Sequence, residues 1–237
     1  MQYTIRRRSQ LIALTAQMGT LTFLATAFFT VYIPETKGYF NLGETGVYIS
    51  SLLLPPVWAA MAAGMGSALA DIVLGYHIYA PATLIIKSAE GFLASLLVRR
   101  LSKLRLGRAT GTLVLVAVPL PLAILGAVFY TGAVELYTIG GTIPTQLNAA
   151  FWILAALALA AYLAYMGLKG LSKPHLCVSF TAGGVVMVVG YFLYQQVVLG
   201  VAAFVEVPFN IMQMLVGSSI ALLVERGLRA INVVKVT

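Results

Sequence analysis

Apolar runs of helical length repeat along the chain and are separated by short polar segments. A helix of about 20 residues crosses a hydrocarbon core of about 30 Å. Six runs reach that length: 10–32, 81–102, 110–133, 147–168, 176–199 and 208–228. They lack the alternating ten-residue segments of a membrane barrel. The pattern therefore predicts an all-α integral membrane protein.

The region 44–76 does not form one simple run, because Pro55 and Pro56 divide it. Proline cannot continue the hydrogen-bond ladder of a helix. We therefore expect a short helix near 44–55 and a longer one near 57–75. The short helix rises only ~1.5 Å per residue and cannot cross a full core alone.

The composition agrees with a chain embedded in a lipid bilayer. Hydrophobic residues make up 60% of the chain and charged residues 9%, whereas soluble domains have about 25% charged residues. The formal net charge of +8 raises the possibility of a nucleic-acid partner. The positions of the basic residues offer a simpler explanation, and no nucleic acid is expected.

The basic residues collect at one end of the predicted helices, on the side of the N-terminus. They are Arg6, Arg7, Arg8, Arg99, Arg100, Lys103, Arg105, Arg108, Lys169, Lys173, Arg226, Arg229 and Lys235. Because cytoplasmic loops are rich in Lys and Arg, both termini are predicted to be cytoplasmic. This arrangement requires two crossings in 44–76 and thus about eight helices. We expect one membrane domain, 1–237, in the cell membrane of a prokaryote.

Four ionisable residues stand within the apolar stretch 66–91, namely Asp71, His77, Lys87 and Glu90. A charge inside the bilayer is costly and marks a functional site by default. Asp71 lies about one turn from the outer end of its predicted helix. Lys87 and Glu90 share a face of the next helix, also in the outer half.

Polar residues of other segments are predicted at the same outer end. They are Asn41, Glu44, Tyr76, Tyr191, Gln195, Asn210 and Gln213, with Glu206 in an outer loop. These groups do not continue through the membrane, as they would in a channel or proton relay. The pattern favours an outward-facing pocket for a small ring compound, with polar groups to orient it and aromatic rings to stack on it.

Structural interpretations of the same residues stay open. Asp71 and Lys87 can neutralise each other between adjacent helices. Glu44 can serve as a carboxylate at the positive end of a helix dipole, and Asn210 as a first-turn polar residue. His77 fits a surface position better than a metal site.

The chain carries no motif for enzymatic chemistry. The phosphate-binding loop G-x-x-x-x-G-K-[ST], H-E-x-x-H and G-x-S-x-G are all absent from the sequence. We therefore expect neither catalysis nor a cofactor or resident metal.

Three segments together resemble a known family. They are GYFNLGE (38–44), GMGSALADIVLGYHIYAPATLIIKSAEGFLA (64–94) and EVPFNIMQMLVGSSIALL (206–223). These motifs are similar to the substrate-binding S component of energy-coupling factor (ECF) transporters, in the riboflavin and hydroxymethylpyrimidine branch. The resemblance covers the first four and the last two predicted helices.

The resemblance implies a division of labour. An S component binds a water-soluble vitamin or precursor (of riboflavin, hydroxymethylpyrimidine/thiamine or pyridoxine type) and passes it on with a transmembrane coupling protein and two ABC ATPases. Its implied pocket residues are Asn41, Lys87, Glu90, Tyr191, Gln195, Asn210 and Gln213, with Asp71 and Tyr76 in support. Ala16 and Thr20 match the small-residue motif that contacts the coupling protein in the family.

Relative to six family helices, the chain is expected to insert a helix pair. The first four family helices then occupy 1–109, the inserted pair 110–170 and the last two helices 171–237. Two other functions stay open: a stand-alone ion-coupled transporter or channel, and a membrane assembly factor without a ligand.

Overall fold

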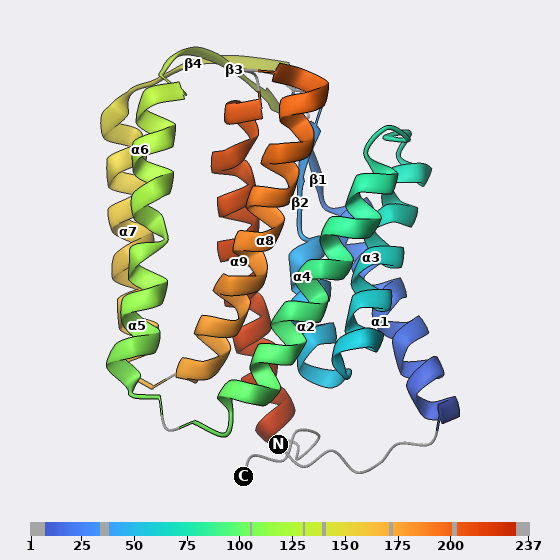
Figure 1. The fold of residues 1–237 in the computed structure, drawn as a ribbon. Helices are drawn as coiled ribbons and strands as arrows, with labels where there is room; N and C mark the ends of the chain where they lie inside the picture. Colours follow the sequence, from blue (N-terminus) through green and yellow to red (C-terminus); the bar gives the residue numbers. More distant parts are fainter. Residues whose placement is uncertain are drawn as a thin grey trace.

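The computed structural model describes residues 8–33, 38–104, 106–129, 131–138, 141–170, 173–200 and 203–230. These parts form a helical bundle with two β-hairpins (Figure 1). The helices are α1 (Arg8–Phe28), α2 (Gly43–Leu53), α3 (Pro56–Val73), α4 (Ala80–Leu101), α5 (Arg108–Ala117), α6 (Pro119–Phe129), α7 (Ala149–Leu168), α8 (Pro174–Leu199) and α9 (Ala203–Ala230). The strands are β1 (Thr30–Ile33), β2 (Gly38–Asn41), β3 (Gly132–Thr138) and β4 (Gly141–Leu147).

The predicted helical membrane fold is confirmed. Within the described residues, six helical segments are long and apolar enough to cross a membrane, and α5 and α6 count together as one of them. α7 adds a shorter apolar stretch, Trp152–Tyr165. With the short α2, the helices match the eight predicted. α5 and α6 are separated by a turn at Val118, directly before Pro119, where a proline is tolerated as the first residue of a helix.

The last helix begins earlier than the sequence pattern indicates. α9 starts at Ala203, so Pro208 lies inside the helix rather than at its start. Glu206 therefore belongs to the first turn of α9 and is not in a loop. Asn210 is the eighth residue of α9 and lies beyond its first turn, which rules out its interpretation as a first-turn residue. Pro208 is the sixth residue and cannot donate a backbone hydrogen bond to the residue four positions earlier.

The double proline separates α2 from α3 as predicted. Leu54 adopts an extended conformation (φ −111°, ψ 146°) before Pro55, as expected of a residue that precedes proline. The break leaves carbonyl groups of α2 without helical partners. Arg99 of α4 donates hydrogen bonds to the carbonyl oxygens of Ser51 (3.1 Å) and Leu54, which satisfies them inside the membrane, as backbone groups there require.

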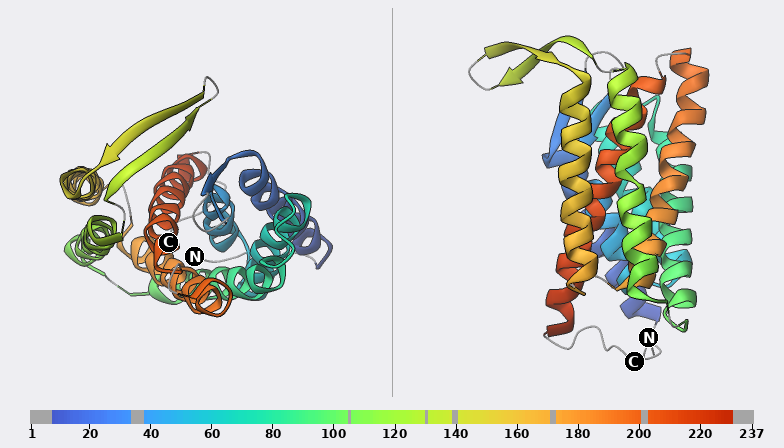
Figure 2. Two further views of the ribbon diagram at one scale, coloured as in Figure 1. Left: turned by 90° about the horizontal axis from the view of Figure 1, so that it is seen from above. Right: turned by 90° about the vertical axis from the view of Figure 1, so that its left-hand side faces the viewer.

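The six helices α1–α4, α8 and α9 surround a common apolar core, and α5–α7 stand together on one side of them, next to α8 and α9 (Figure 2). In the core, Tyr48 of α2 stacks on Phe180 of α8 with ring centroids 4.7 Å apart. Met187, Met214 and Leu215 pack around them and are buried.

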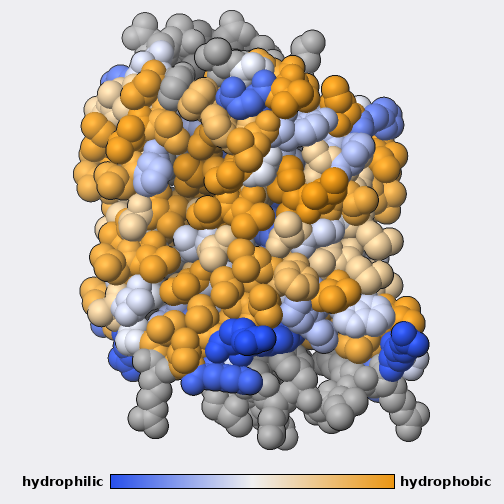
Figure 3. All heavy atoms as spheres, viewed as in Figure 1, coloured by the Kyte–Doolittle hydropathy of each residue, from blue (hydrophilic) through white to orange (hydrophobic). Residues whose placement is uncertain are grey.

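The outer surface has the polarity of a membrane protein. Hydrophobic residues cover the middle of the face seen in Figure 3, and the strongest hydrophilic patch lies at its lower end. That end holds the first and last described residues, Arg8 and Ala230 (Figure 1). There, Glu225 pairs with Arg229 (2.7 Å) and lies 3.9 Å from Lys173. By the positive-inside rule this end is cytoplasmic, and we call the opposite end the outer end.

Close contacts between α1, α2 and α3 depend on glycine. A Cβ atom at Gly46 of α2 would lie 2.6 Å from Thr22 Cα, and one at Gly66 of α3 would lie 2.9 Å from Thr22 Cβ. Small residues let membrane helices approach in this way. This packing holds α2 inside the bundle, in contact with α1, α4 and α9.

The two β-hairpins were not predicted. β1 pairs antiparallel with β2, and β3 with β4. A helical-period search does not detect such short strands. β1 takes up the end of the predicted helical run 10–32, because α1 ends at Phe28. The β1–β2 hairpin matters for the site, because β2 carries Tyr39 and Asn41 to the outer end of the bundle.

Candidate functional site

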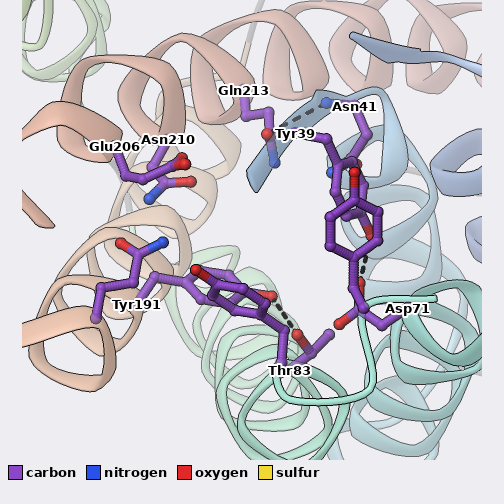
Figure 4. Close-up of a pocket in the computed structure, with 11 residues that line it drawn as sticks. Tyr39, Asn41, Asp71, Thr83, Tyr191, Glu206, Asn210 and Gln213 are labelled. Carbon is purple, nitrogen blue, oxygen red and sulfur yellow. Dashed lines mark hydrogen bonds between the residues drawn. The ribbon is translucent and has the colours of Figure 1, made fainter. Parts of the chain in front are cut away.

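A polar pocket opens at the outer end of the bundle, where β2, α3, α4, α8 and α9 meet (Figure 4). The empty volume of this pocket, including its opening to solvent, is about 410 Å³. The described lining consists of Tyr39, Asn41, Asp71, Tyr76, Tyr79, Thr83, Tyr191, Gln195, Glu206, Asn210 and Gln213. Four tyrosines, two carboxylates and four amides thus face one cavity.

One wall of the pocket is built by a tyrosine and a carboxylate. The Tyr39 hydroxyl donates a hydrogen bond to Oδ1 of Asp71, and the Tyr39 and Tyr76 ring centroids are 4.6 Å apart. Burial raises the pKa of Tyr39 well above its usual range, and the negative charge of Asp71 raises it further. Tyr39 therefore keeps its proton and remains a donor to Asp71.

The opposite wall joins α4 to α8. The Tyr191 hydroxyl donates a hydrogen bond of 2.9 Å to Oγ1 of Thr83. Thr83 stands between Tyr191 and Asp71 in Figure 4. Burial raises the pKa of Tyr79, and the charge of Glu206 adds to the effect. The tyrosine hydroxyls of this wall are thus neutral donors and acceptors.

Amide groups from β2 and α9 form the third side. Gln213 Oε1 accepts a hydrogen bond of 3.2 Å from the backbone N–H of Asn41. Asn41 Oδ1 in turn accepts one of 2.8 Å from the N–H of Gly43, at the start of α2. Asn210 Nδ2 and Gln195 Oε1, both buried, have no hydrogen-bond partner in the described structure. Buried polar atoms are normally paired, so these two are candidates for contact with a ligand.

An ion cluster lies beneath the pocket. Lys87 of α4 pairs with Glu44 of α2 and lies 3.1 Å from Oε2 of Glu90. Lys87 is 4% exposed, and both carboxylates are 0% exposed. The Lys87 ammonium is 5.7 Å from the centre of the Tyr191 ring, so this ring separates the cluster from the cavity.

Below this ion cluster the polar groups give way to the apolar core. Along the described helices, no charged side chain occurs between Glu90 and the cytoplasmic end, where Arg99 and Glu225 lie. Tyr48, Phe180 and Met187 fill the space between. The hydroxyls of Ser50 and Ser51 at this depth donate to carbonyls one turn earlier in α2. The pocket is therefore open at one end and closed by packed side chains at the other.

The comparison with known families fits this geometry. A family model described as ECF-type riboflavin transporter, S component, matches residues 8–165, well over half of the chain. The chain belongs to this family.

A second comparison gives a shorter match. An uncharacterized protein in a gap 3′ region of Pyrococcus woesei is 38% identical to this S component over 68 residues. The match covers 29% of this chain and 45% of the relative. The chain thus spans less than half of the relative's length, and the relative's name carries no function.

The family match confirms the resemblance and agrees with the expectation that the chain is not an enzyme. The matched range runs through the helix pair at 110–165 and ends before α8. The division of the domain into family helices and an inserted pair therefore stays a prediction.

Seven of the nine expected pocket residues of this S component line the cavity: Asn41, Asp71, Tyr76, Tyr191, Gln195, Asn210 and Gln213. Lys87 and Glu90 are not among the described lining residues, and a ligand contact of these two residues stays a prediction. Lys87 is directed instead toward Glu44, a residue of another helix. It does not pair with Asp71, so the suggested neutralisation between Asp71 and Lys87 is absent. Their contact with a ligand is a prediction that the geometry does not favour.

Four lining residues were not predicted: Tyr39, Tyr79, Thr83 and Glu206. Thr83 was the easiest to find, because it shares a helix face with Lys87. Glu206 was assigned to a loop because Pro208 was taken as the start of a helix. Tyr39 belongs to a strand that the sequence pattern did not reveal.

The remaining candidate residues lie at the surface. Ala16 and Thr20 are exposed on α1, whose buried residues are Thr15, Thr22 and Thr26. His77 is exposed, as expected. Among the described residues, no group of three or more His, Cys, Asp or Glu side chains is placed to hold a metal ion.

Proposed function

We propose that this protein is the substrate-capture subunit of an ECF-type importer and binds a water-soluble vitamin or vitamin precursor in the outer pocket. One observation carries the proposal. The pocket gathers polar and aromatic side chains from five elements at the outer end, and packed apolar side chains close it below. Such a site can hold a ligand but offers no path through the membrane.

The lining suits a small aromatic ring compound. Tyr39, Tyr76, Tyr79 and Tyr191 supply ring faces for stacking. The unpaired amide atoms of Gln195 and Asn210 can exchange hydrogen bonds with polar substituents of the ring. Ligand sites commonly combine aromatic walls with a few placed polar groups.

The proposal assigns the energy-consuming step to other subunits. The chain has no phosphate-binding loop of the Walker A type, so a separate coupling protein and two ABC ATPases would move the bound vitamin inward. The exposed face of α1 with Ala16 and Thr20 is the proposed contact with the coupling protein. The proposed location is the cell membrane of a prokaryote.

Two measurements test this function. Calorimetric titration of the purified protein with riboflavin, thiamine, hydroxymethylpyrimidine, pyridoxine and related vitamins should give saturable binding of at least one compound without ATP. Proteoliposomes should accumulate that compound only when the coupling protein and ATPases are also present. If no compound binds, the proposed function is wrong. Replacement of Ala16 by Leu should reduce uptake but leave binding unchanged, and Ile12→Leu, on the same exposed face, is the matched control.

One observation favours a stand-alone ion-coupled transporter instead. The cluster of Glu44, Lys87 and Glu90 is a buried charge group close to the pocket, and such groups mark ion pathways in membrane proteins. Uptake by this chain alone in vesicles without ATP, driven by a proton or sodium gradient, would establish that function. The apolar core beneath Glu90 argues against it.

A further inference from the structure

The described pocket lining has carboxylates but no basic residue. Asp71 and Glu206 both face the cavity and are each 3% exposed. No lysine, arginine or histidine is among the described lining residues. Asp71 makes no ion pair among the described residues, and a buried carboxylate that lacks a positive partner carries a large desolvation cost. The site is therefore electrostatically prepared for positive charge.

The lysine beneath the pocket does not supply this charge. Lys87 is held by two carboxylates, Glu44 and Glu90. Its ammonium is therefore already paired and is not among the described groups that line the cavity. Nearby carboxylates strengthen the attraction of a cavity for cations.

Asp71 is also oriented for a ligand. Its Oδ1 accepts the hydrogen bond of Tyr39, which fixes the carboxylate at the end of α3. Its other oxygen, Oδ2, is buried and has no hydrogen-bond partner in the described structure. Gln195 Oε1 is a second unpaired acceptor in the same cavity. Two acceptors, one of them charged, call for a ligand that donates hydrogen bonds.

The surrounding rings favour the same ligand charge. Tyr39 contacts Asp71 through its hydroxyl, and its ring lies 4.6 Å from that of Tyr76. An aromatic face attracts a cation that lies near its centroid. Anionic ligands would meet two carboxylates and no compensating cation in the described lining. A neutral ligand would leave Asp71 without a positive partner.

We propose that the pocket selects a cationic nitrogen compound, namely a ring that carries a protonated amine or a positively charged ring nitrogen, and that this nitrogen lies against Asp71. The proposal rests on the proposed function and narrows it to one charge class of vitamin or precursor. Asp71 is the specificity-determining residue, Glu206 adds to the negative potential, and Asn210 Nδ2 donates to an acceptor elsewhere on the ring.

The first test compares ligands of different charge on the unmodified protein. The probes are thiamine and pyridoxamine as cations, pyridoxine and riboflavin as neutral compounds, and biotin and pantothenate as anions. Pyridoxamine and pyridoxine are a matched pair, because an aminomethyl group replaces a hydroxymethyl group. A charge-assisted hydrogen bond should give the cationic compounds roughly tenfold or greater advantage, seen as tighter binding of pyridoxamine than of pyridoxine.

The second test changes the protein. Asp71→Asn should weaken binding of the best cationic probe by roughly tenfold or more and should change binding of neutral probes far less. Tyr39→Phe is the matched control, since it removes the hydrogen bond to Asp71 but keeps the charge. Glu206→Gln should give a smaller loss with the same preference for cations. If Asp71→Asn does not fold, Glu206→Gln and the unmodified protein still decide the question.

The outcomes separate the two proposals. Tighter binding of a neutral or anionic vitamin than of every cationic probe overturns the charge selection but supports the capture function. Equal loss of cationic and neutral binding in Asp71→Asn also overturns it. Absence of binding by every probe contradicts the capture function itself.

Discussion

Two groups of ionisable residues lie one above the other in the outer half of this S component, and they are used differently. In the pocket, Asp71 lines the cavity, and its Oδ2 has no hydrogen-bond partner among the described residues. In the cluster beneath, Lys87 is closed between Glu44 and Glu90. The pocket can therefore bind a ligand, whereas the charged groups of the cluster pair with one another and join α2 to α4. Burial alone does not distinguish a binding residue from a structural one; its partners do.

The largest effect should come from the cluster. Lys87→Met leaves Glu44 and Glu90 buried without a cation, and removal of one partner of a buried ion pair costs about 3–5 kcal/mol. We expect a marked fall in melting temperature in detergent, measured by scanning fluorimetry. The triple variant with Glu44→Gln and Glu90→Gln should recover most of the loss, because no buried charge then remains. Wild-type stability in the single variant would show that the cluster is not structural.

The two amides of α9 should separate binding from stability. Asn210 Nδ2 has no partner in the described structure, so Asn210→Ala should lower affinity for the vitamin roughly tenfold and leave the melting temperature nearly unchanged. Gln213 accepts a hydrogen bond from the backbone N–H of Asn41, so Gln213→Ala should lower both the affinity for the vitamin and the melting temperature. Calorimetric titration and thermal melting of the two variants test this. If Asn210→Ala and Gln213→Ala changed the melting temperature equally, this would contradict the assigned contacts.

The boundary between the two groups is the Tyr191–Thr83 hydrogen bond. Tyr191→Phe removes the hydroxyl but keeps the ring over Lys87, and Thr83→Val removes the acceptor. A double-mutant cycle on thermal stability should give a coupling energy of about 1 kcal/mol between them. Zero coupling would mean that the bond of 2.9 Å contributes nothing and does not join α4 to α8 in this wall of the pocket.

The smallest effect should appear at alkaline pH. The pKa values of Tyr39 and Tyr79 are raised in the folded protein, mainly by burial, so the unfolded chain loses these protons at lower pH than the folded one. Stability should therefore be constant near neutral pH and fall as pH rises above the ordinary tyrosine pKa of about 10. Tyrosinate absorbance should rise together with unfolding. Tyr39→Phe should make the fall shallower, and an unchanged slope would contradict the assigned pKa shift.

Much of the fold follows from the sequence because lipid imposes strong local rules. Helix lengths follow from the thickness of the hydrocarbon core, and orientation follows from the basic residues. The break at Pro55 and Pro56 follows from the geometry of proline. The β1–β2 hairpin and the early start of α9 did not follow, because short strands leave weak local signals and because proline is more typical of the first position of a helix than of its sixth.

The sequence by itself determined that this protein is a helical membrane bundle with its basic residues at one end and its polar residues at the other. Both properties depend on local composition and on the cost of placing charge in lipid. Only the tertiary structure decided which polar residues face the cavity and which face each other. Asn41 and Gln213 meet across 172 residues of sequence, and Lys87 of α4 pairs with Glu44 of α2 rather than with Asp71 of α3. Such pairings depend on the distances between packed helices, which spacing along one helix cannot reveal.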